Sequence, residues 1–255
     1  MSNSELAGRH ALITGGGTGI GLAIARALAG AGARVTICGR RAEVLEAAAA
    51  DTPGLFPLVM DVSEPDSVRS TVTAAAAERG PVAITVANAG IAEGRSLAKM
   101  DLAWWRDMMA INLDGAFLTI QACLATLDRD AWGRVIAVSS IAGTKGLRGA
   151  PAYTASKHGL IGLIRGLSED FIGSAVTFNA LCPAYVDTPI VERNAIAIRD
   201  RAGVSADEAL DMMVRANRHK RLIAPEEVAA AALWLCAPGS ESMNGQAIQI
   251  AGGQF

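Results

Sequence analysis

The sequence predicts an α/β protein built on one doubly wound, mostly parallel sheet of about seven strands, with helices on both faces. Short β-branched or apolar runs alternate with longer Ala-rich stretches from end to end, the pattern of β-α-β units. The chain has 255 residues, of which 51% are hydrophobic, a routine length for one α/β domain with a substantial core. No linker interrupts the alternation, so we expect a single domain over residues 1–255.

The alternating runs place the elements in order. Strands are expected at 10–14, 34–38, 55–60, 82–88, 133–139, 175–182 and 247–250. Helices are expected at 19–30, 41–50, 64–79, 104–127 and 153–171, the third of them capped by Ser63. Right-handed crossovers between parallel strands then distribute the helices over the two faces of the sheet.

The stretch 188–221 does not fit this alternation. It follows the sixth strand, carries Pro189 early, and mixes charged residues with apolar residues at helical spacing. A segment of this length beyond the carboxyl end of a strand is placed to cover a ligand. We therefore predict a substrate lid at 188–221, the alternative being an ordinary helical insertion.

Composition excludes several classes of function. The formal net charge is -2 and no basic stripe is present, so we expect no nucleic-acid partner. No run of eighteen apolar residues and no signal-like amino terminus occurs, so we expect a cytoplasmic protein without a membrane partner. The four cysteines and three histidines are widely spaced, which predicts buried thiols, no disulfide framework and no metal site.

A glycine-rich turn links the first expected strand to the first helix. The turn reads Thr-Gly-Gly-Gly-Thr-Gly-Ile-Gly over 14–21. Glycines let the backbone approach a pyrophosphate, and the helix amino terminus supplies free N–H groups. Its position between strand and helix favours dinucleotide binding over a simple turn. The predicted contacts are Gly15, Gly17, Thr18, Gly19, Ile20 and Gly21.

Further motifs follow in a characteristic order. Asn88-Ala89-Gly90 follows the fourth strand, Asn112 lies in the next helical region, Ser140 follows the fifth strand, and Tyr153-Thr-Ala-Ser-Lys157 comes thirteen residues later. With these motifs and the glycine turn, the chain resembles the short-chain dehydrogenase/reductase family over essentially its whole length. Its carboxyl-terminal part resembles 3-hydroxyacyl and 3-hydroxybutyrate dehydrogenases and polyketide ketoreductases. The resemblance implies a Rossmann fold and hydride transfer between a nicotinamide and a ketone or secondary alcohol.

The spacing of Tyr153 and Lys157 has its own chemistry. Four residues apart on a helix, they share one face, and a nearby ammonium favours the phenolate and lowers the pKa of a phenol. Ser140, at the end of a strand, can donate a hydrogen bond to a substrate oxygen. The resemblance assigns Ser140, Tyr153 and Lys157 as the catalytic triad, with Asn112 holding a water that links Lys157 to solvent. His158 faces away on the helix, and we expect it to be structural.

The end of the second strand bears on the choice of coenzyme. Gly39 stands where NAD enzymes offer an acidic residue to the adenosine ribose, and Arg40 and Arg41 can meet a 2'-phosphate. We therefore favour NADP(H) as the coenzyme. NAD(H) is the alternative, because the glycine turn has no basic residue. The resemblance implies further contacts, which are Asp61, Val62, Asn88 and Gly90 on the adenosine side, Lys157 at the nicotinamide ribose, and Tyr153, Val186 and Thr188 at the nicotinamide end. Ala184 departs from the family's usual Pro-Gly, which weakens the assignment of Val186 and Thr188.

The expected substrate is a fairly large, mostly apolar or cyclic ketone or secondary alcohol. Where hydroxybutyrate enzymes place carboxylate anchors, this chain has Ala92, Ala142 and Ala150, and an apolar lining is expected from Ile141, Ala142, Leu147 and Tyr185. Helical runs that are apolar on more than one face suggest self-association, and the resemblance implies a homotetramer. The alternatives are an NAD-dependent 3-hydroxyacyl-type dehydrogenase, a nucleotide-binding regulator without catalysis, and a methyltransferase; Gly39 argues against the last.

Overall fold

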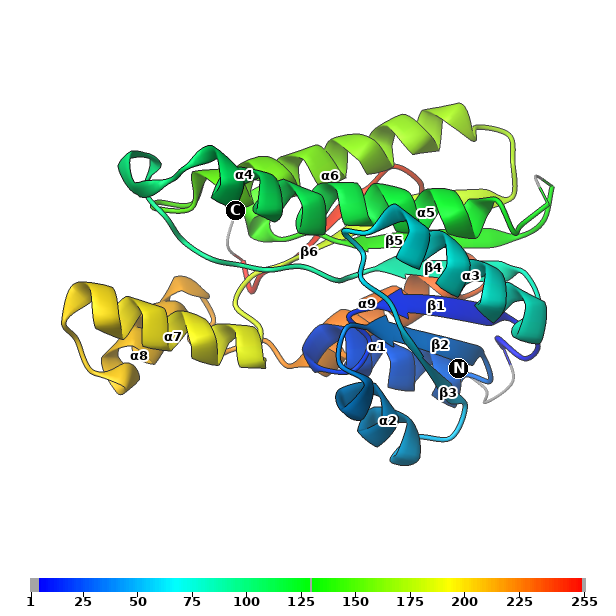
Figure 1. Cartoon of the computed structure of the whole chain (residues 1–255), viewed down its shortest axis with the longest axis horizontal. Coiled ribbons are helices and arrows are strands. Elements are labelled where there is room, and N and C mark those ends of the chain that lie inside the picture. The colour runs from blue at the N-terminus through cyan, green and yellow to red at the C-terminus, as the bar shows by residue number, and fades with distance from the viewer. Residues whose placement is uncertain (1–4, 129, 254–255) are drawn as a thin grey trace.

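The computed structural model describes residues 5–128 and 130–253 and contains one seven-stranded parallel sheet (Figure 1). The strand order is β3-β2-β1-β4-β5-β6-β7, the doubly wound topology predicted from the sequence. The strands are β1 (His10–Thr14), β2 (Arg34–Gly39), β3 (Leu55–Val59), β4 (Val82–Ala87), β5 (Gly133–Val138), β6 (Val176–Pro183) and β7 (Ala247–Ile250). Every residue of β1, β4, β5 and β6 is buried, because helices cover both faces.

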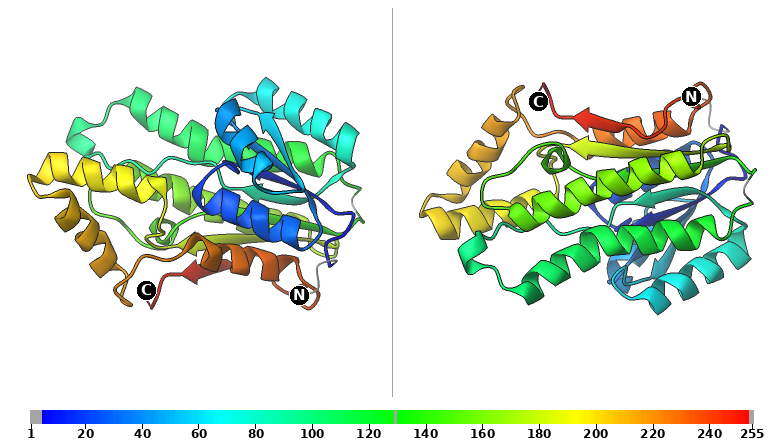
Figure 2. Two further views of the ribbon diagram at one scale, coloured as in Figure 1. Left: turned by 90° about the horizontal axis from the view of Figure 1, so that it is seen from below. Right: turned by 90° about the horizontal axis from the view of Figure 1, so that it is seen from above.

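Helices form a layer on each side of the sheet (Figure 2). On one face α1 (Gly19–Gly30) packs against α9 (Pro225–Cys236), with α2 (Ala42–Ala50) beside them. The other face carries α3 (Pro65–Arg79), α4 (Leu102–Met109), α5 (Gly115–Leu124) and α6 (Pro151–Asp170). The four cysteines are free and buried, as expected for structural thiols. Among the described residues no helix is long and apolar enough to cross a membrane.

The boundaries differ from the sequence prediction at identifiable places. The helix expected at 104–127 is α4, a π turn at Ala110–Asp114, and α5. The expected Ser63 cap is wrong: α3 begins at Pro65, whose ring fits the first helical position, and the Ser63 hydroxyl instead donates to Asp61 Oδ1 at 2.7 Å. Helix α9 was not predicted, although Pro225 and two glutamates in its first turn mark a helix start.

The segment after β6 extends beyond the carboxyl ends of the strands. It forms α7 (Pro189–Ala202) and α8 (Ala206–Ala216), which project from the sheet in Figures 1 and 2. The two helices share a small core of their own, made by Val191, Ala195, Ala209 and Met213. This segment and the loops after β1, β4 and β5 therefore surround the edge where open α/β sheets bind ligands.

Candidate active site

The glycine turn between β1 and α1 is packed too closely for side chains. Gly15 and Gly19 have φ values of +63° and +52°, a region that favours glycine. A Cβ on Gly15 would lie 2.9 Å from Asn88 Nδ2, and one on Gly21 would overlap the Gly15 carbonyl. The turn therefore leaves a backbone-lined cradle at the amino terminus of α1, which fits a phosphate-bearing ligand.

Asn88 holds this turn against the end of β4. Its Nδ2 donates to the Thr14 carbonyl at 2.9 Å and to the Gly15 carbonyl at 3.3 Å. The Thr14 hydroxyl accepts from the backbone N–H groups of Asn88 and Ala89 at 3.0 and 2.9 Å. The bracing role expected for Asn88 is thus visible as four hydrogen bonds between two neighbouring strand ends.

A cavity of about 670 Å³, the glycine-turn cavity, runs along this cradle. Of the predicted coenzyme contacts it is lined by Gly15, Gly17, Thr18, Gly19, Ile20, Arg40, Arg41, Asp61, Val62, Asn88, Gly90 and Thr188. Gly21 does not line it, because that residue is buried in α1 against the Gly15 carbonyl. Arg193 of α7 also lines the cavity, and no sequence motif pointed to it.

Cationic side chains gather at the β2 end of the glycine-turn cavity. Arg40 Nη1 lies 4.0 Å from Asp61 Oδ2, and the Arg40 side chain is 68% exposed. Partial burial of Asp61 would raise its pKa, but hydrogen bonds from Ser63 and the charge of Arg40 outweigh burial and hold the pKa below its usual value. Gly39 is followed by Arg40 and Arg41 at this end, where the ribose of a dinucleotide is expected.

Ser140, Tyr153 and Lys157 come together in a second cavity of about 390 Å³, the tyrosine cavity. It shares Ile20, Asn88, Gly90, Ile91, Thr188 and Ile190 with the glycine-turn cavity, so the two are neighbours. Ser140 follows β5, and the other two lie on α6. Lys157 Nζ lies 5.9 Å from the centre of the Tyr153 ring, which confirms that the two residues share one helix face.

Adjacent serines at the end of β5 have different surroundings. The Ser139 hydroxyl donates to the Lys157 carbonyl at 3.1 Å and so ties β5 to α6. Ser140 Oγ accepts from the Ala142 N–H at 3.1 Å and forms a hydrogen bond with the Tyr153 side chain. The alternation expected of an extended chain therefore makes Ser140 the partner of the phenol.

The electrostatics of the pair differ from the expectation that Lys157 lowers the pKa of Tyr153. Burial raises the pKa of the Tyr153 phenol, and the hydrogen bond with Ser140 only partly opposes this effect. Burial also lowers the pKa of Lys157 to about 8, with a weaker opposing influence from Cys182. The Lys157 ammonium donates to the Val138 carbonyl at 2.8 Å, so its hydrogen bond is with the end of β5 and not with the phenol.

Asn112 lies in the π turn between α4 and α5 and is buried. Its Oδ1 accepts from the Ile91 N–H at 2.8 Å, and its Nδ2 donates to the Ile91 carbonyl at 2.9 Å and to Ser156 Oγ at 3.1 Å. A Cβ on Gly90 would lie 3.1 Å from Asn112 Oδ1 and 3.6 Å from Lys157 Nζ. The absence of a side chain at Gly90 thus lets the amide and the ammonium approach the same point.

The remaining walls of the tyrosine cavity are mainly apolar. Ile141, Leu147 and Tyr185 line it as expected, and so do Ala92, Ala150, Val186, Val191 and Met213. Ala142, expected in the lining, is instead fully buried in the short 3₁₀ turn Ile141–Gly143 and does not line the cavity. Glu93, Arg148 and Asn194 add polar groups to the wall.

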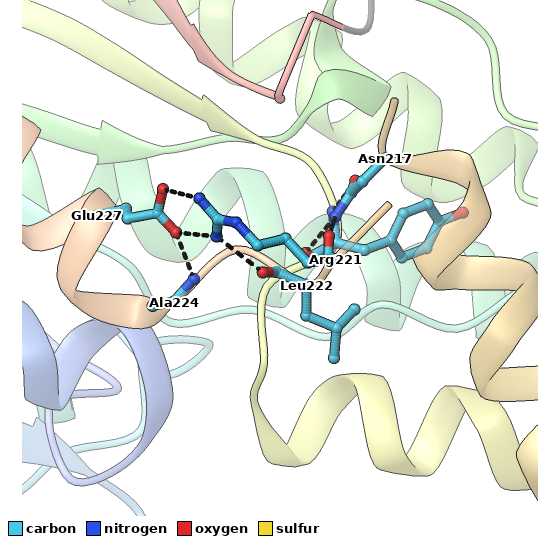
Figure 3. A network of polar contacts seen from close by, with 6 residues as sticks. Asn217, Arg221, Leu222, Ala224 and Glu227 are labelled. Atoms are coloured by element: carbon cyan, nitrogen blue, oxygen red, sulfur yellow. Dashed lines mark hydrogen bonds and ion pairs between the residues drawn. The ribbon is translucent and has the colours of Figure 1, made fainter. Parts of the chain in front are cut away.

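A network of polar contacts attaches the α7–α8 segment to the body of the protein (Figure 3). Asn217, which is completely buried, donates to the carbonyls of Tyr185 and Arg221 at 2.9 and 2.8 Å and accepts from the Tyr185 N–H. Arg221 forms a bidentate pair with Glu227 of α9 at 2.6 and 2.8 Å. Both ends of the segment are therefore held at one point, and no sequence motif indicated Asn217.

His158 lines neither of the two cavities. His158 is exposed, and its Nδ1 hydrogen-bonds the Thr154 carbonyl at 2.9 Å on its own helix, which agrees with the structural role expected. Within residues 5–128 and 130–253 no cluster of three or more His, Cys, Asp or Glu side chains could hold a metal ion.

The fold and the paired cavities define a nicotinamide-dependent oxidoreductase of the Rossmann class. The family model described as short chain dehydrogenase matches residues 9–197, and the chain belongs to this family. It therefore transfers a hydride between a nicotinamide coenzyme and a ketone or secondary alcohol.

Relatives of known name cover almost the whole chain. The chain is 36% identical to cis-4-hydroxycyclohexanecarboxylate dehydrogenase of Sinomonas cyclohexanicum, over 97% of this chain and 96% of that protein. It is 30% identical to D-beta-hydroxybutyrate dehydrogenase of Rhizobium meliloti, over 95% and 97%. Among solved structures, a variant of actinorhodin polyketide ketoreductase with NADPH superposes with a TM-score of 0.93 at 32% identity, covering 96% of this chain and 97% of that one.

Proposed function

We propose that Tyr153 donates the proton to the carbonyl oxygen in reduction and accepts it from the alcohol in oxidation. The supporting observation is the position of its side chain, with Ser140 and Lys157, in an apolar cavity that adjoins the glycine-turn cavity. The nicotinamide coenzyme, when bound, supplies or accepts the hydride. Ser140 hydrogen-bonds the substrate oxygen, and the Lys157 ammonium stabilises the phenolate. Asn112 holds the water that passes protons from Lys157 to solvent.

Replacing the phenol tests this assignment. Tyr153→Phe removes only the hydroxyl, and loss of a positioned general acid lowers kcat by roughly 10²- to 10⁴-fold. Oxidation of the reduced nicotinamide is followed by its absorbance with a panel of ketones, and the reverse reaction with the matching alcohols. Tyr185→Phe is the control for removal of a hydroxyl from the same cavity and is expected to keep most of the kcat. Full activity of Tyr153→Phe would show that another group transfers the proton.

We infer that the coenzyme is NADP(H). Arg40 and Arg41 line the end of the glycine-turn cavity, and a guanidinium forms charge-assisted hydrogen bonds with a phosphate. Asp61 is engaged by Ser63 and Arg40, which leaves Gly39 without a carboxylate for a free ribose. Arg40→Ala with Arg41→Ala should raise the KM for NADPH by about tenfold or more and leave that for NADH nearly unchanged. Equal changes for both coenzymes would contradict the preference.

We further infer that the substrate is a mostly apolar, cyclic ketone or alcohol and that the α7–α8 segment is the lid over it. The apolar walls and the volume of about 390 Å³ support a ring rather than a short acid. The related dehydrogenase named for cis-4-hydroxycyclohexanecarboxylate suggests 4-oxocyclohexanecarboxylate and cyclohexanone as first test compounds. A higher kcat/KM for 3-oxobutyrate than for either ring would overturn this inference.

We also infer that the chain forms a homotetramer. Exposed apolar side chains on helices of both layers, Phe117 of α5 at 45% and Trp234 of α9 at 44%, support burial of both layers against other copies. Light scattering of the protein as it elutes from a size-exclusion column gives the mass of the oligomer directly. A monomer at micromolar concentration would refute the assignment.

A further inference from the structure

Helix α7 borders both cavities at once. Pro189 and Arg193 line the glycine-turn cavity, whereas Val191, Asn194 and Ala197 line the tyrosine cavity. Residues 189 and 193 lie four apart, as do 190 and 194, so each pair occupies one stripe of the helix. Helix α7 therefore contributes to the walls of both cavities.

The start of α7 is already in contact with the glycine turn. A Cβ on Gly19 would lie 3.1 Å from Thr188 Cγ2 and 4.0 Å from Pro189 Cδ. One turn further along α7, Arg193 reaches the wall of the same cavity. Figure 1 and the left view of Figure 2 show the amino-terminal end of α7 close to the amino-terminal end of α1. Arg193 thus brings a cationic side chain from a separate segment to the wall of the cavity that contains the cradle.

Most of the charged residues that line the glycine-turn cavity are cationic. Its cationic lining residues are Arg40, Arg41 and Arg193, and its acidic one is Asp61, which lies beside Arg40. The turn itself, 15–21, contains no basic residue, so only backbone N–H groups and the dipole of α1 face a diphosphate there. Among the side chains that the structure describes, Arg193 has no hydrogen-bond or ion-pair partner.

We propose that Arg193 binds the diphosphate of the coenzyme and that coenzyme binding thereby fixes the lid. The proposal rests on the dinucleotide function and the lid assigned above. A guanidinium forms paired, charge-assisted hydrogen bonds with phosphate oxygens, and here it supplies the cation that the glycine turn lacks. Since coupling between two equilibria is reciprocal, a coenzyme that contacts Arg193 favours the position of α7 in which Val191 and Asn194 complete the wall of the tyrosine cavity.

Coenzyme fragments separate this contact from the contacts of Arg40 and Arg41. Titration calorimetry measures binding of NADPH, of ADP-ribose, which carries the diphosphate without a 2'-phosphate, and of 2'-AMP, which carries the 2'-phosphate alone. Arg193→Ala should weaken NADPH and ADP-ribose by about tenfold and leave 2'-AMP unchanged, with partial recovery in Arg193→Lys. The control is Arg215→Ala, which removes an exposed arginine of α8 that pairs with Asp211 and lines neither cavity.

Proteolysis gives a second measurement that does not depend on turnover. Thermolysin is suitable because it does not cut at arginine, so the substitution removes no cleavage site. NADPH should slow cleavage within 189–221 several-fold in the wild type and in Arg215→Ala, and much less in Arg193→Ala at saturating NADPH. If the wild type binds neither NADPH nor ADP-ribose, the proposed dinucleotide function itself fails. If it binds and Arg193→Ala matches Arg215→Ala in affinity and protection, the role of Arg193 is refuted.

Discussion

Replacing Lys157 with methionine should stabilise the protein while it abolishes efficient proton transfer. Burial lowers the pKa of Lys157 from an ordinary 10.5 to about 8, which corresponds to roughly 3 kcal/mol of free energy by which folding disfavours the ammonium, at 1.36 kcal/mol per pKa unit. Methionine matches the aliphatic stem and removes the charge. It also leaves the Val138 carbonyl without its donor, which costs about 1–2 kcal/mol. The net gain in unfolding free energy at pH 7 is about 1–2 kcal/mol.

The dependence on pH distinguishes this effect from better packing. The folded pKa lies below the unfolded value, so the unfolded state binds more protons between about pH 8 and 10.5, and wild-type stability rises with pH in that window. Lys157→Met lacks this contribution. The extra unfolding free energy of Lys157→Met over the wild type should therefore be constant below pH 8, and it should vanish or reverse as pH approaches 10.

Urea denaturation followed by circular dichroism at pH 7, 8, 9 and 10 measures these differences. Lys99→Met is the matched control, because Lys99 is exposed and should give no difference at any pH. A Lys157→Met variant that is less stable than the wild type at pH 7, by an amount that does not change with pH, would refute the reasoning.

Three further outcomes follow from single contacts. His10 is buried between the Gly80 carbonyl and Thr36 Oγ1, and burial lowers its pKa, so unfolding free energy should fall as pH drops through 6.5; that slope should be absent in His10→Gln but kept in His158→Gln, as urea titrations will show. Asn217→Ala frees both ends of the lid and should raise the substrate KM about tenfold and speed thermolysin cleavage within 189–216, with little change in kcat. Gly39→Asp meets only Leu45, at 3.6 Å from the new Cβ, and should shift the kcat/KM ratio of NADH to NADPH at least tenfold toward NADH; an unchanged ratio would argue that the cavity end does not bind ribose.

Sequence patterns predicted correctly those features whose residues are close together both in the chain and in space. The glycine turn joins β1 to α1 without intervening residues, so its shape follows from its own composition. Tyr153 and Lys157 share a helix face because they are four residues apart. The strands were recognisable because each is a short run rich in apolar residues, and their ends differ from prediction by at most one residue.

Contacts between residues far apart in the sequence could not be predicted from sequence patterns. Arg193 lies more than 170 positions from the turn whose cavity it lines, and Asn217 bonds the backbone of Tyr185, 32 residues earlier. Neither spacing forms a pattern, because the chain path between the partners sets their distance. The π turn that buries Asn112 likewise depends on its contacts with Ile91 and Ser156.

The order of the strands, the phosphate-binding turn and the pairing of a phenol with an ammonium can all be read from residue types and spacing alone, since they rest on periodicity and short-range geometry. Tertiary structure decided the ionisation of that pair: burial raises the pKa of Tyr153 and lowers that of Lys157, because desolvation depends on how many other segments surround a group. It also brought Arg193 to the glycine-turn cavity, since only the folded chain carries the charge of α7 to the end of α1.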